Sequence, residues 1–324
     1  MKNLSEKMRQ CFSQSTMILL KRVGAISKHM GCKAYLIGGT VRDLFLCKET
    51  LDIDIVIEGD AILFGEELAH ELHGIIISHK RFGTCTVTTP EYIKIDFATA
   101  RRETYAKPAA LPTVEVSSFR DDLARRDFTV NAMAISLNEG DFGKLIDFFD
   151  GVGDIEKKHI KVLHDKSFVD DPTRILRGIR LEKRLGFTIE PRTANLIRKS
   201  IEKEIYKRVE EPRLRDEIML VLKEKEPFRV IERMDEFRAL KIVHPYLKLH
   251  KDLGGVFMAI DEACGWYNDN SPRKRSIEKW LIYLIALFDD VSYDGMLYFC
   301  NKFELKRGER LRMISYKKLS SKVL

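Results

Sequence analysis

Two carboxylates stand two residues apart in a strand-like segment, residues 51–57, where Asp52 and Asp54 alternate with Ile53 and Ile55. Side chains along a β-strand point to alternate faces, so both carboxylates are expected on the same face. Two such carboxylates repel each other unless a cation lies between them. Their oxygens suit Mg²⁺, which in proteins takes one or two carboxylates together with phosphate oxygens. The pair therefore indicates a magnesium site that handles a phosphate compound.

A glycine pair precedes this segment: Gly38 and Gly39 lead into Thr40, Val41, Arg42 and Asp43. Because glycine has no side chain, the backbone there can approach a polyphosphate closely. Together with the two aspartates, this spacing favours a metal-dependent nucleotidyl-transfer site. The competing interpretation of the acidic pair is a solvated strand end.

A third carboxylate is offered by the predicted strand 92–97, where Ile93 and Ile95 face one way and Lys94 and Asp96 the other. Two-metal sites clamp the attacking and leaving oxygens of an in-line displacement. Such sites commonly take another acid from a neighbouring strand, and Asp96 is the candidate. An exposed acid at a strand end is the alternative.

A second cluster occupies residues 125–134. Arg125 and Arg126 can grip a triphosphate through their planar guanidinium groups. Asp127 and Asn131 are expected to share one face of a helix, since they stand four residues apart, and they supply acceptor and amide groups for a ribose. The alternative is a helix start that carries a solvated basic pair.

A third cluster begins at Asp170 and Asp171 and continues through residues 172–184. Four arginines fall on one stripe of a predicted helix: Arg174, Arg177, Arg180 and Arg184. Asp171 and Arg174 together carry acceptor and fork-shaped donor groups that can match the Watson–Crick edge of a base. This arrangement favours a protein-side template for nucleotide choice. A salt-bridged, solvent-facing helix is the alternative.

The order of elements that must position these clusters is mixed up to residue 100. Apolar residues at helical spacing predict helices at 4–30 and 61–73, and Thr40 is expected to cap a third helix. Strands are predicted at 34–37, 51–57, 74–78, 84–88 and 92–97. Residues 101–118 show no periodicity and contain Pro108 and Pro112, so they predict a long surface loop.

Beyond residue 150 strand signals disappear, and helices are predicted at 171–185, 192–201, 213–222, 228–237, 253–267 and 277–288. The expected fold is an α/β head with a mixed sheet of about five strands, followed by an all-α neck and body. We place the head at residues 1–150, the neck with the base-selecting motif at 151–225, and the body with a basic C-terminus at 226–324.

Composition restricts the class of protein further. A net charge of +7 favours a polyanionic partner. No run of about 18 uncharged apolar residues occurs, so no membrane partner is expected. The six cysteines have no zinc-ligand spacing and indicate a reducing cytoplasm. No Walker-type phosphate loop is present.

Taken in order, the three clusters resemble those of the class II tRNA nucleotidyltransferases and bacterial poly(A) polymerases. Residues 38–43 with Asp52 and Asp54 resemble the first motif, residues 125–133 the ribose and triphosphate motif, and residues 170–174 the amino-acid template motif. Asp170 stands where a Glu is more usual. The chain ends early for the family, so the C-terminal tail of the family is expected to be short or truncated here.

The resemblance implies a polymerase-β-like head that uses Mg²⁺, CTP and ATP, and a tRNA partner bound at its acceptor stem and 3′ end. It implies that Asp52 and Asp54 hold the metals and that Asp96 assists the attacking hydroxyl. Asp171 and Arg174 would pair with the incoming base, and Arg177 and Arg180 would match the arginines that follow in the family. The motif residues expected to bind nucleotide are Gly38, Gly39, Arg42, Asp43, Arg125, Arg126, Asp127, Asn131, Asp171, Arg174, Arg177 and Arg180.

Within this family the sequence leaves several products open. Full CCA addition is the main expectation, with A-only addition, CC-only addition and poly(A) synthesis as alternatives. The length of the 101–118 segment argues against CC-only addition, whereas residues 101–105 resemble members with partial activity and keep A-only addition open. A non-catalytic RNA-binding module is a remote alternative, because it predicts a broken metal pair and both aspartates are intact. The oligomeric state is left open.

Overall fold

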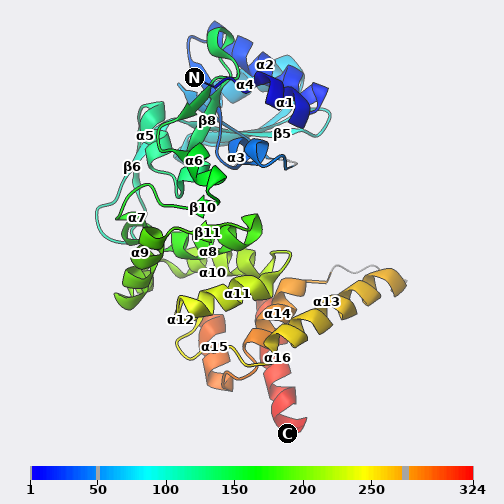
Figure 1. Cartoon of the computed structure of the whole chain (residues 1–324). Helices are drawn as coiled ribbons and strands as arrows, with labels where there is room; N and C mark the ends of the chain where they lie inside the picture. Colours follow the sequence, from blue (N-terminus) through cyan, green and yellow to red (C-terminus); the bar gives the residue numbers. More distant parts are fainter. Residues whose placement is uncertain (1, 49–51, 272–276, 324) are drawn as a thin grey trace. The chain divides into compact units, whose positions relative to one another are not determined.

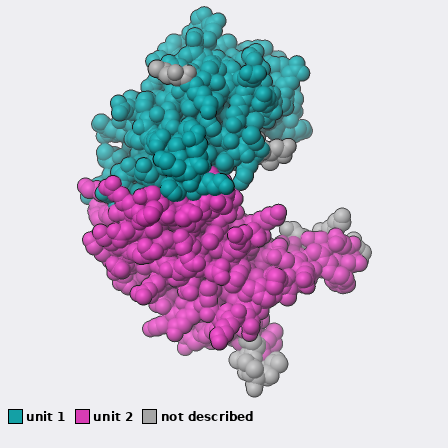
Figure 2. Space-filling model, viewed as in Figure 1, with its two compact units in different colours: residues 1–106, 111–165 teal, residues 107–110, 166–324 magenta. Residues whose placement is uncertain are grey.

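The computed structural model describes residues 2–48, 52–271 and 277–323, with side chains to Leu319. It divides into two compact units (Figure 2), residues 1–106 with 111–165, and residues 107–110 with 166–324. The first unit thus continues past residue 150, where the sequence analysis ends the head. Leu51, the first residue of the predicted strand 51–57, lies outside the described residues.

A mixed seven-stranded sheet organises the first unit (Figure 1), with the strand order β3-β4-β5-β2-β1-β8-β9. The strands are β1 (Lys33–Ile37), β2 (Ile53–Glu58), β3 (Ile75–His79), β4 (Thr84–Thr88), β5 (Lys94–Thr99), β8 (Met133–Ser136) and β9 (Leu145–Asp147). Only β2 and β5 pair in parallel, and the other neighbours are antiparallel. The α/β class and the mixed sheet are confirmed. The expected number of about five strands is too low, because no strand was predicted at β8 or at β9, which has only three residues.

Helices cover both faces of this sheet. The described helices of the unit are α1 (Ser5–Cys11), α2 (Gln14–His29), α3 (Gly39–Phe45), α4 (Ala61–Leu72), α5 (Phe119–Ala124) and α6 (Gly151–Glu156). The predicted helix 4–30 is broken in two, because Ser13 adopts an extended conformation and its side chain caps α2 by accepting from the Thr16 N–H. Thr40 does not cap α3. It lies inside that helix, and its hydroxyl donates to the Asp52 carbonyl oxygen at 2.6 Å.

The segment predicted as a long loop contains a β-hairpin. Strands β6 (Arg101–Thr104) and β7 (Thr113–Val116) pair antiparallel, with Arg101 opposite Val116. Residues 101–104 of β6 are all polar, so they lack the alternation of apolar and polar residues that marks a half-buried strand. Residues 113–116 of β7 do alternate, but four residues are too short a run to predict a strand from period alone.

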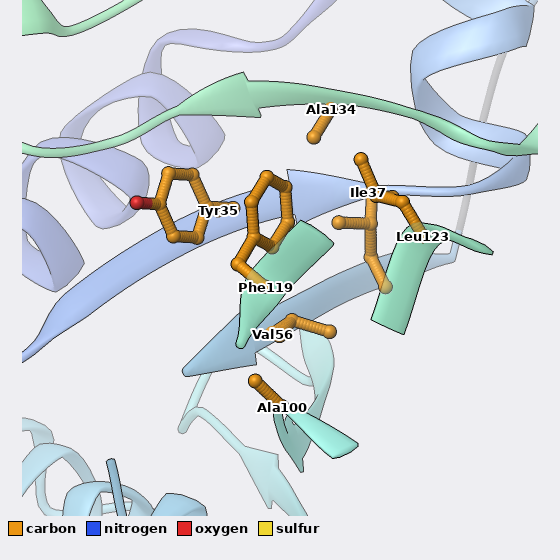
Figure 3. Packing of buried hydrophobic residues seen from close by; sticks show 7 residues of the cluster. All are labelled: Tyr35, Ile37, Val56, Ala100, Phe119, Leu123 and Ala134. Carbon is orange, nitrogen blue, oxygen red and sulfur yellow. The ribbon is translucent and has the colours of Figure 1, made fainter. Parts of the chain in front are cut away.

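A hydrophobic cluster fixes α5 against the sheet (Figure 3). It contains Tyr35, Ile37, Val56, Ala100, Phe119, Leu123 and Ala134. Phe119 of α5 stacks on Tyr35 of β1 with ring centroids 3.9 Å apart. Its backbone N–H donates to Glu58 of β2 at 2.9 Å. The start of α5 is therefore held by both apolar and polar contacts.

The second unit is almost entirely helical, as predicted. Its elements are α7 (Ser167–Asp170), α8 (Thr173–Leu185), β11 (Thr188–Ile189), α9 (Pro191–Glu202), α10 (Glu211–Leu222), α11 (Pro227–Glu236), α12 (Leu240–Val243), α13 (Leu253–Asn270), α14 (Lys279–Leu287), α15 (Tyr293–Lys302) and α16 (Arg307–Val323). The expectation of no strand after residue 150 misses β11 and, in the first unit, β10 (His159–Ile160), each only two residues long. Within the described residues, no helix has both the length and the apolar character needed to cross a bilayer.

Candidate active site

Two of the predicted carboxylates, Asp54 and Asp96, meet on one face of the sheet. Asp54 of β2 lies directly opposite Asp96 of β5 in the parallel register. Asp54 shares its face with Val56, which packs into the cluster under α5, because the two residues stand two apart. Asp52 lies just before β2. The predicted alternation therefore agrees with the observed faces for Asp54 in β2 and for Asp96 in β5, whereas Asp52 precedes the strand.

The negative charges of Asp52 and Asp96 repel that of Asp54. The pKa of Asp54 is raised, chiefly by burial and further by the negative charges of Asp96 and Asp52, while the guanidinium of Arg126 lowers it. The hydroxyl of Thr86 donates to Asp96. A cation bound beside these carboxylates would offset their repulsion, so the arrangement is suited to a metal ion.

Gly38 has a conformation that side chains disfavour, with φ 72° and ψ −138°. A Cβ atom built there would lie 3.2 Å from Arg126 Nη1 and 3.8 Å from Asp54 Oδ2. Glycine at this position therefore leaves room for the guanidinium group beside the carboxylate.

A cavity of about 400 Å³ opens next to these groups. Asp54, Asp96 and Arg126 line it, together with His79, Thr84 and Thr86 from neighbouring strands. Two acids and one arginine thus face the same space within the first unit.

The arginine pair follows α5 directly, and the structure corrects its predicted setting. The predicted helix through Asp127 and Asn131 is absent. The helix α5 ends at Ala124, and residues 129–131 form a single 3₁₀ turn before β8. The two side chains still meet, because Asn131 Nδ2 donates to Asp127 Oδ1 at 3.0 Å.

Asp122, which was not among the predicted site residues, holds both arginines. Its side chain is fully buried, and its Oδ1 accepts from Arg125 Nε at 2.9 Å and Nη2 at 2.7 Å. Its Oδ2 accepts from Arg126 Nη2 at 3.1 Å. Its spacing of three and four residues from the two arginines could have indicated these pairs.

The glycine motif and the arginine motif are joined through Arg42. This buried arginine donates to the Asp43 carboxylate at 2.9 and 3.0 Å and to Asn131 Oδ1 at 2.6 Å. Arg42, Asp43, Asp127 and Asn131 therefore form one hydrogen-bonded group in the first unit. Gly39 allows this packing, since a Cβ there would lie 3.3 Å from Arg42 Nη2.

The second unit carries the predicted base-selecting residues at the start of α8. The carboxylate of Asp171 accepts from the N–H and the hydroxyl of Thr173 at 3.1 and 2.6 Å. It also forms an ion pair of 2.9 Å with Arg213, which the sequence analysis did not consider. Arg174 is buried, and its Nη1 donates to Ser167 at 2.9 Å.

The later arginines of the predicted stripe contact α10. Arg180 lies between Glu217 and Glu224, with ion pairs of 3.4 and 3.2 Å. Arg177 is exposed and lies 3.9 Å from Glu217. Burial raises the pKa of Glu217, whereas Arg177 and Arg180 lower it. These ion pairs agree with the alternative interpretation of the arginine stripe, which is a salt-bridged helix.

Two sequence families match the chain. Residues 34–161 match the Poly A polymerase head domain, and residues 186–250 match the family described as the probable RNA and SrmB- binding site of polymerase A. The first match contains the carboxylate and arginine clusters, and the second lies wholly within the helical unit.

Solved structures extend the likeness to nearly the whole chain. A CCA-adding enzyme in an apo form is 36% identical with a TM-score of 0.87, over 96% of this chain and 73% of that chain. The chain belongs to the tRNA nucleotidyltransferase and poly(A) polymerase family. The Thermotoga maritima CCA-adding enzyme complexed with tRNA is 33% identical with a TM-score of 0.81, over 96% of this chain and 72% of that chain.

The family includes longer proteins. The A-adding tRNA nucleotidyltransferase of Geobacter sulfurreducens is 37% identical over 317 residues, which is 98% of this chain but 36% of the relative. The chain therefore spans just over a third of that relative's length. The family resemblance drawn from the three motifs is confirmed.

Proposed function

We propose that this nucleotidyltransferase-family protein transfers a nucleotide from ATP or CTP to the 3′ end of tRNA in the cytoplasm. The observation that carries the proposal is the meeting of Asp54, Asp96 and Arg126 at one cavity. The attacking hydroxyl of the RNA forms a bond to the α-phosphorus, and pyrophosphate leaves with the electrons of the broken bond.

The residues around Asp54 fit Mg²⁺. Among the described residues, no group of three or more acids, histidines or cysteines forms a self-sufficient metal cage. Mg²⁺ does not need one, because it retains waters and takes one or two carboxylates together with substrate phosphates. Asp52 and Asp54 would hold the ion, which would neutralise the charge that develops on the phosphate oxygens.

The proposed roles of the other residues follow from their contacts. Asp96 accepts the proton of the attacking hydroxyl or aligns that hydroxyl. Arg125 and Arg126 bind the triphosphate, and the Asp127–Asn131 pair binds the ribose. Nucleotide binding also involves the residues of the glycine motif, which are Gly38, Gly39, Arg42 and Asp43.

In the second unit, Asp171 and Arg174 select the base, and Arg213 holds the Asp171 carboxylate through its ion pair. Arg180 is engaged by two glutamates and supports α8. Arg177 is the more exposed of the two and is the better candidate for a phosphate of nucleotide or RNA. Replacing Arg174 with Ala should relax the choice between bases, and an unchanged preference would remove it from the template.

The proposal also concerns which nucleotides the protein adds to the tRNA. Full CCA addition stays the main expectation, and A-only addition is the second candidate because the Geobacter relative is named A-adding. Three tRNA substrates separate the products: one that lacks CCA, one that ends in C and one that ends in CC. Extension of the last substrate alone, with ATP alone, would identify A-only addition.

The decisive variant is Asp54→Asn. It should abolish incorporation on all three tRNAs, whereas tRNA binding should stay within about twofold, because the RNA phosphates are contacted by basic groups. Glu91→Gln, which removes an exposed charge from the turn before β5, is the matched control and should keep full activity. An Asp54→Asn protein that still adds nucleotides would refute the metal assignment.

A further inference from the structure

Glu103 of β6 lies at the centre of an ion-pair chain that the sequence motifs do not include. Its Oε1 accepts from Arg125 Nη1 at 2.9 Å and from Arg101 Nη2 at 3.5 Å. Its Oε2 accepts from the Tyr105 hydroxyl at 3.0 Å. Its side chain is only 10% exposed, so these contacts are shielded from water.

The series of ion pairs continues from Arg125 toward the carboxylates. Arg125 also donates twice to Asp122, and the second oxygen of Asp122 accepts from Arg126. Arg126 lines the same cavity as Asp54. A continuous series of contacts therefore leads from the β6–β7 hairpin to the edge of the carboxylate cavity. It passes through Glu103, Arg125, Asp122 and Arg126 in that order.

Orientation of the last arginine depends on this series. Asp122 is fully buried, so it cannot exchange its arginine partners for water. In the part of the chain that the structure describes, Arg126 Nε is buried without a hydrogen-bond partner, so this guanidinium is oriented through the hydrogen bond of Nη2 to Asp122. If Arg125 loses Glu103, it can draw Asp122 toward itself, and Arg126 then loses its alignment.

We propose that Glu103 is a positioning residue for nucleotide binding: it acts through Arg125 and Asp122 to aim Arg126 into the cavity, and so makes the triphosphate site depend on the position of the β6–β7 hairpin. The inference rests on the proposed function, because it takes the arginine pair to hold a triphosphate. Glu103 itself is not among the residues that line the cavity.

The test compares Glu103→Gln with Glu115→Gln. Both remove one negative charge from the same hairpin, but the ion pair of Glu115 with Arg102 is an exposed contact, in which the side chains are 51% and 58% exposed. Calorimetric titration of the full chain with ATP and Mg²⁺ measures affinity without any RNA. We expect Glu103→Gln to weaken ATP binding about tenfold, since it replaces a charge-assisted hydrogen bond, and Glu115→Gln to leave it within about twofold.

Kinetics on tRNA add a readout that a purely structural role would not change. The KM for the nucleotide should rise about tenfold in Glu103→Gln with kcat within about threefold, because a uniform loss of binding raises KM alone. Equal ATP affinities in the two variants, or a fall in kcat without a change in KM, would overturn the inference.

Two further results keep the conclusions apart. If Glu103→Gln fails to fold, Glu103→Asp keeps the charge but shortens the reach to Arg125, and a several-fold weaker affinity is then expected, with an unchanged affinity counting against the inference. A wild-type protein that binds ATP with the predicted variant pattern but extends no tRNA would refute the proposed function alone. A wild-type protein that binds no ATP would overturn both.

Discussion

Gly38 offers a direct test of the geometry at the carboxylate cavity. Replacing it with Ala would place a methyl group 3.2 Å from Arg126 Nη1 and 3.8 Å from Asp54 Oδ2. The first separation is shorter than ordinary van der Waals contact, so the guanidinium must move by a few tenths of an ångström. The backbone must also keep a φ of 72°, which a residue with a side chain resists.

These two effects have different sizes and different readouts. A residue held in a sparsely populated conformation costs about 1–3 kcal/mol. A loss of 2 kcal/mol would lower Tm by roughly 4–8 °C in a unit of this size. A 1 Å misplacement at a reacting centre can cost about 10²-fold in rate, so a shift of a few tenths should cost about fivefold in kcat/KM. That factor corresponds to about 1 kcal/mol of transition-state stabilisation.

Gly31→Ala separates the two effects. Gly31 also has a positive φ, of 66°, but a Cβ there would meet no atom within 4 Å. Both variants should lose Tm by similar amounts, and only Gly38→Ala should lose activity when both are assayed well below their melting temperatures. Equal kcat/KM values in the two variants would refute the idea that Gly38 makes room for Arg126.

Two predictions concern the helical unit. His244 is 3% exposed, and burial together with Lys302 lowers its pKa, so the unfolded chain binds a proton that the folded chain rejects. The free energy of unfolding should therefore fall as pH drops below about 6.5, and thermal melts of His244→Gln should lack this component; identical pH dependence in both proteins would contradict the assignment. Glu182 is buried and accepts from Arg233 at 2.7 and 3.0 Å, so Arg233→Met should cost about 3 kcal/mol in urea unfolding. The exposed Arg229 of the same helix is the control, and its replacement by Met should cost less than about 1 kcal/mol; equal losses would show that the Glu182 contact is not stabilising.

The sequence was most informative for strands whose faces follow from the alternation of their side chains. The alternation of Asp52 to Ile55 and of Ile93 to Asp96 predicted the faces of two strands, because side chains in a strand have a period of two. It did not predict that Asp54 would lie opposite Asp96. That register depends on the pairing of β2 with β5, which is a contact between segments some forty residues apart.

The failures have a common physical cause. No strand was predicted at β8, and the β6–β7 hairpin was predicted as a loop, because both segments take their structure from contacts with other parts of the first unit. Met133–Ser136 is fully buried against β1, and β6 is anchored by Glu103 and Arg101. Tertiary context of this kind overrides local preference for strand formation. The spacing of Asp122 from Arg125 and Arg126 permits ion pairs, but residue types alone do not show which acid of a short acidic helix is buried.

One strand illustrates how the fold and the candidate site depend on the same register. On one face of β2, Asp54 lines the cavity, Val56 packs under α5, and Glu58 accepts from the Phe119 N–H and the Tyr35 hydroxyl at 2.9 and 3.2 Å. A slip of one residue would turn all three side chains to the other face. A slip that brought Ile55 to the place of Asp54 would bring Ile57 to the place of Val56 and Gly59 to the place of Glu58. The apolar cluster therefore holds the cavity in place, since the contacts that fix α5 also determine where the arginines after it can reach.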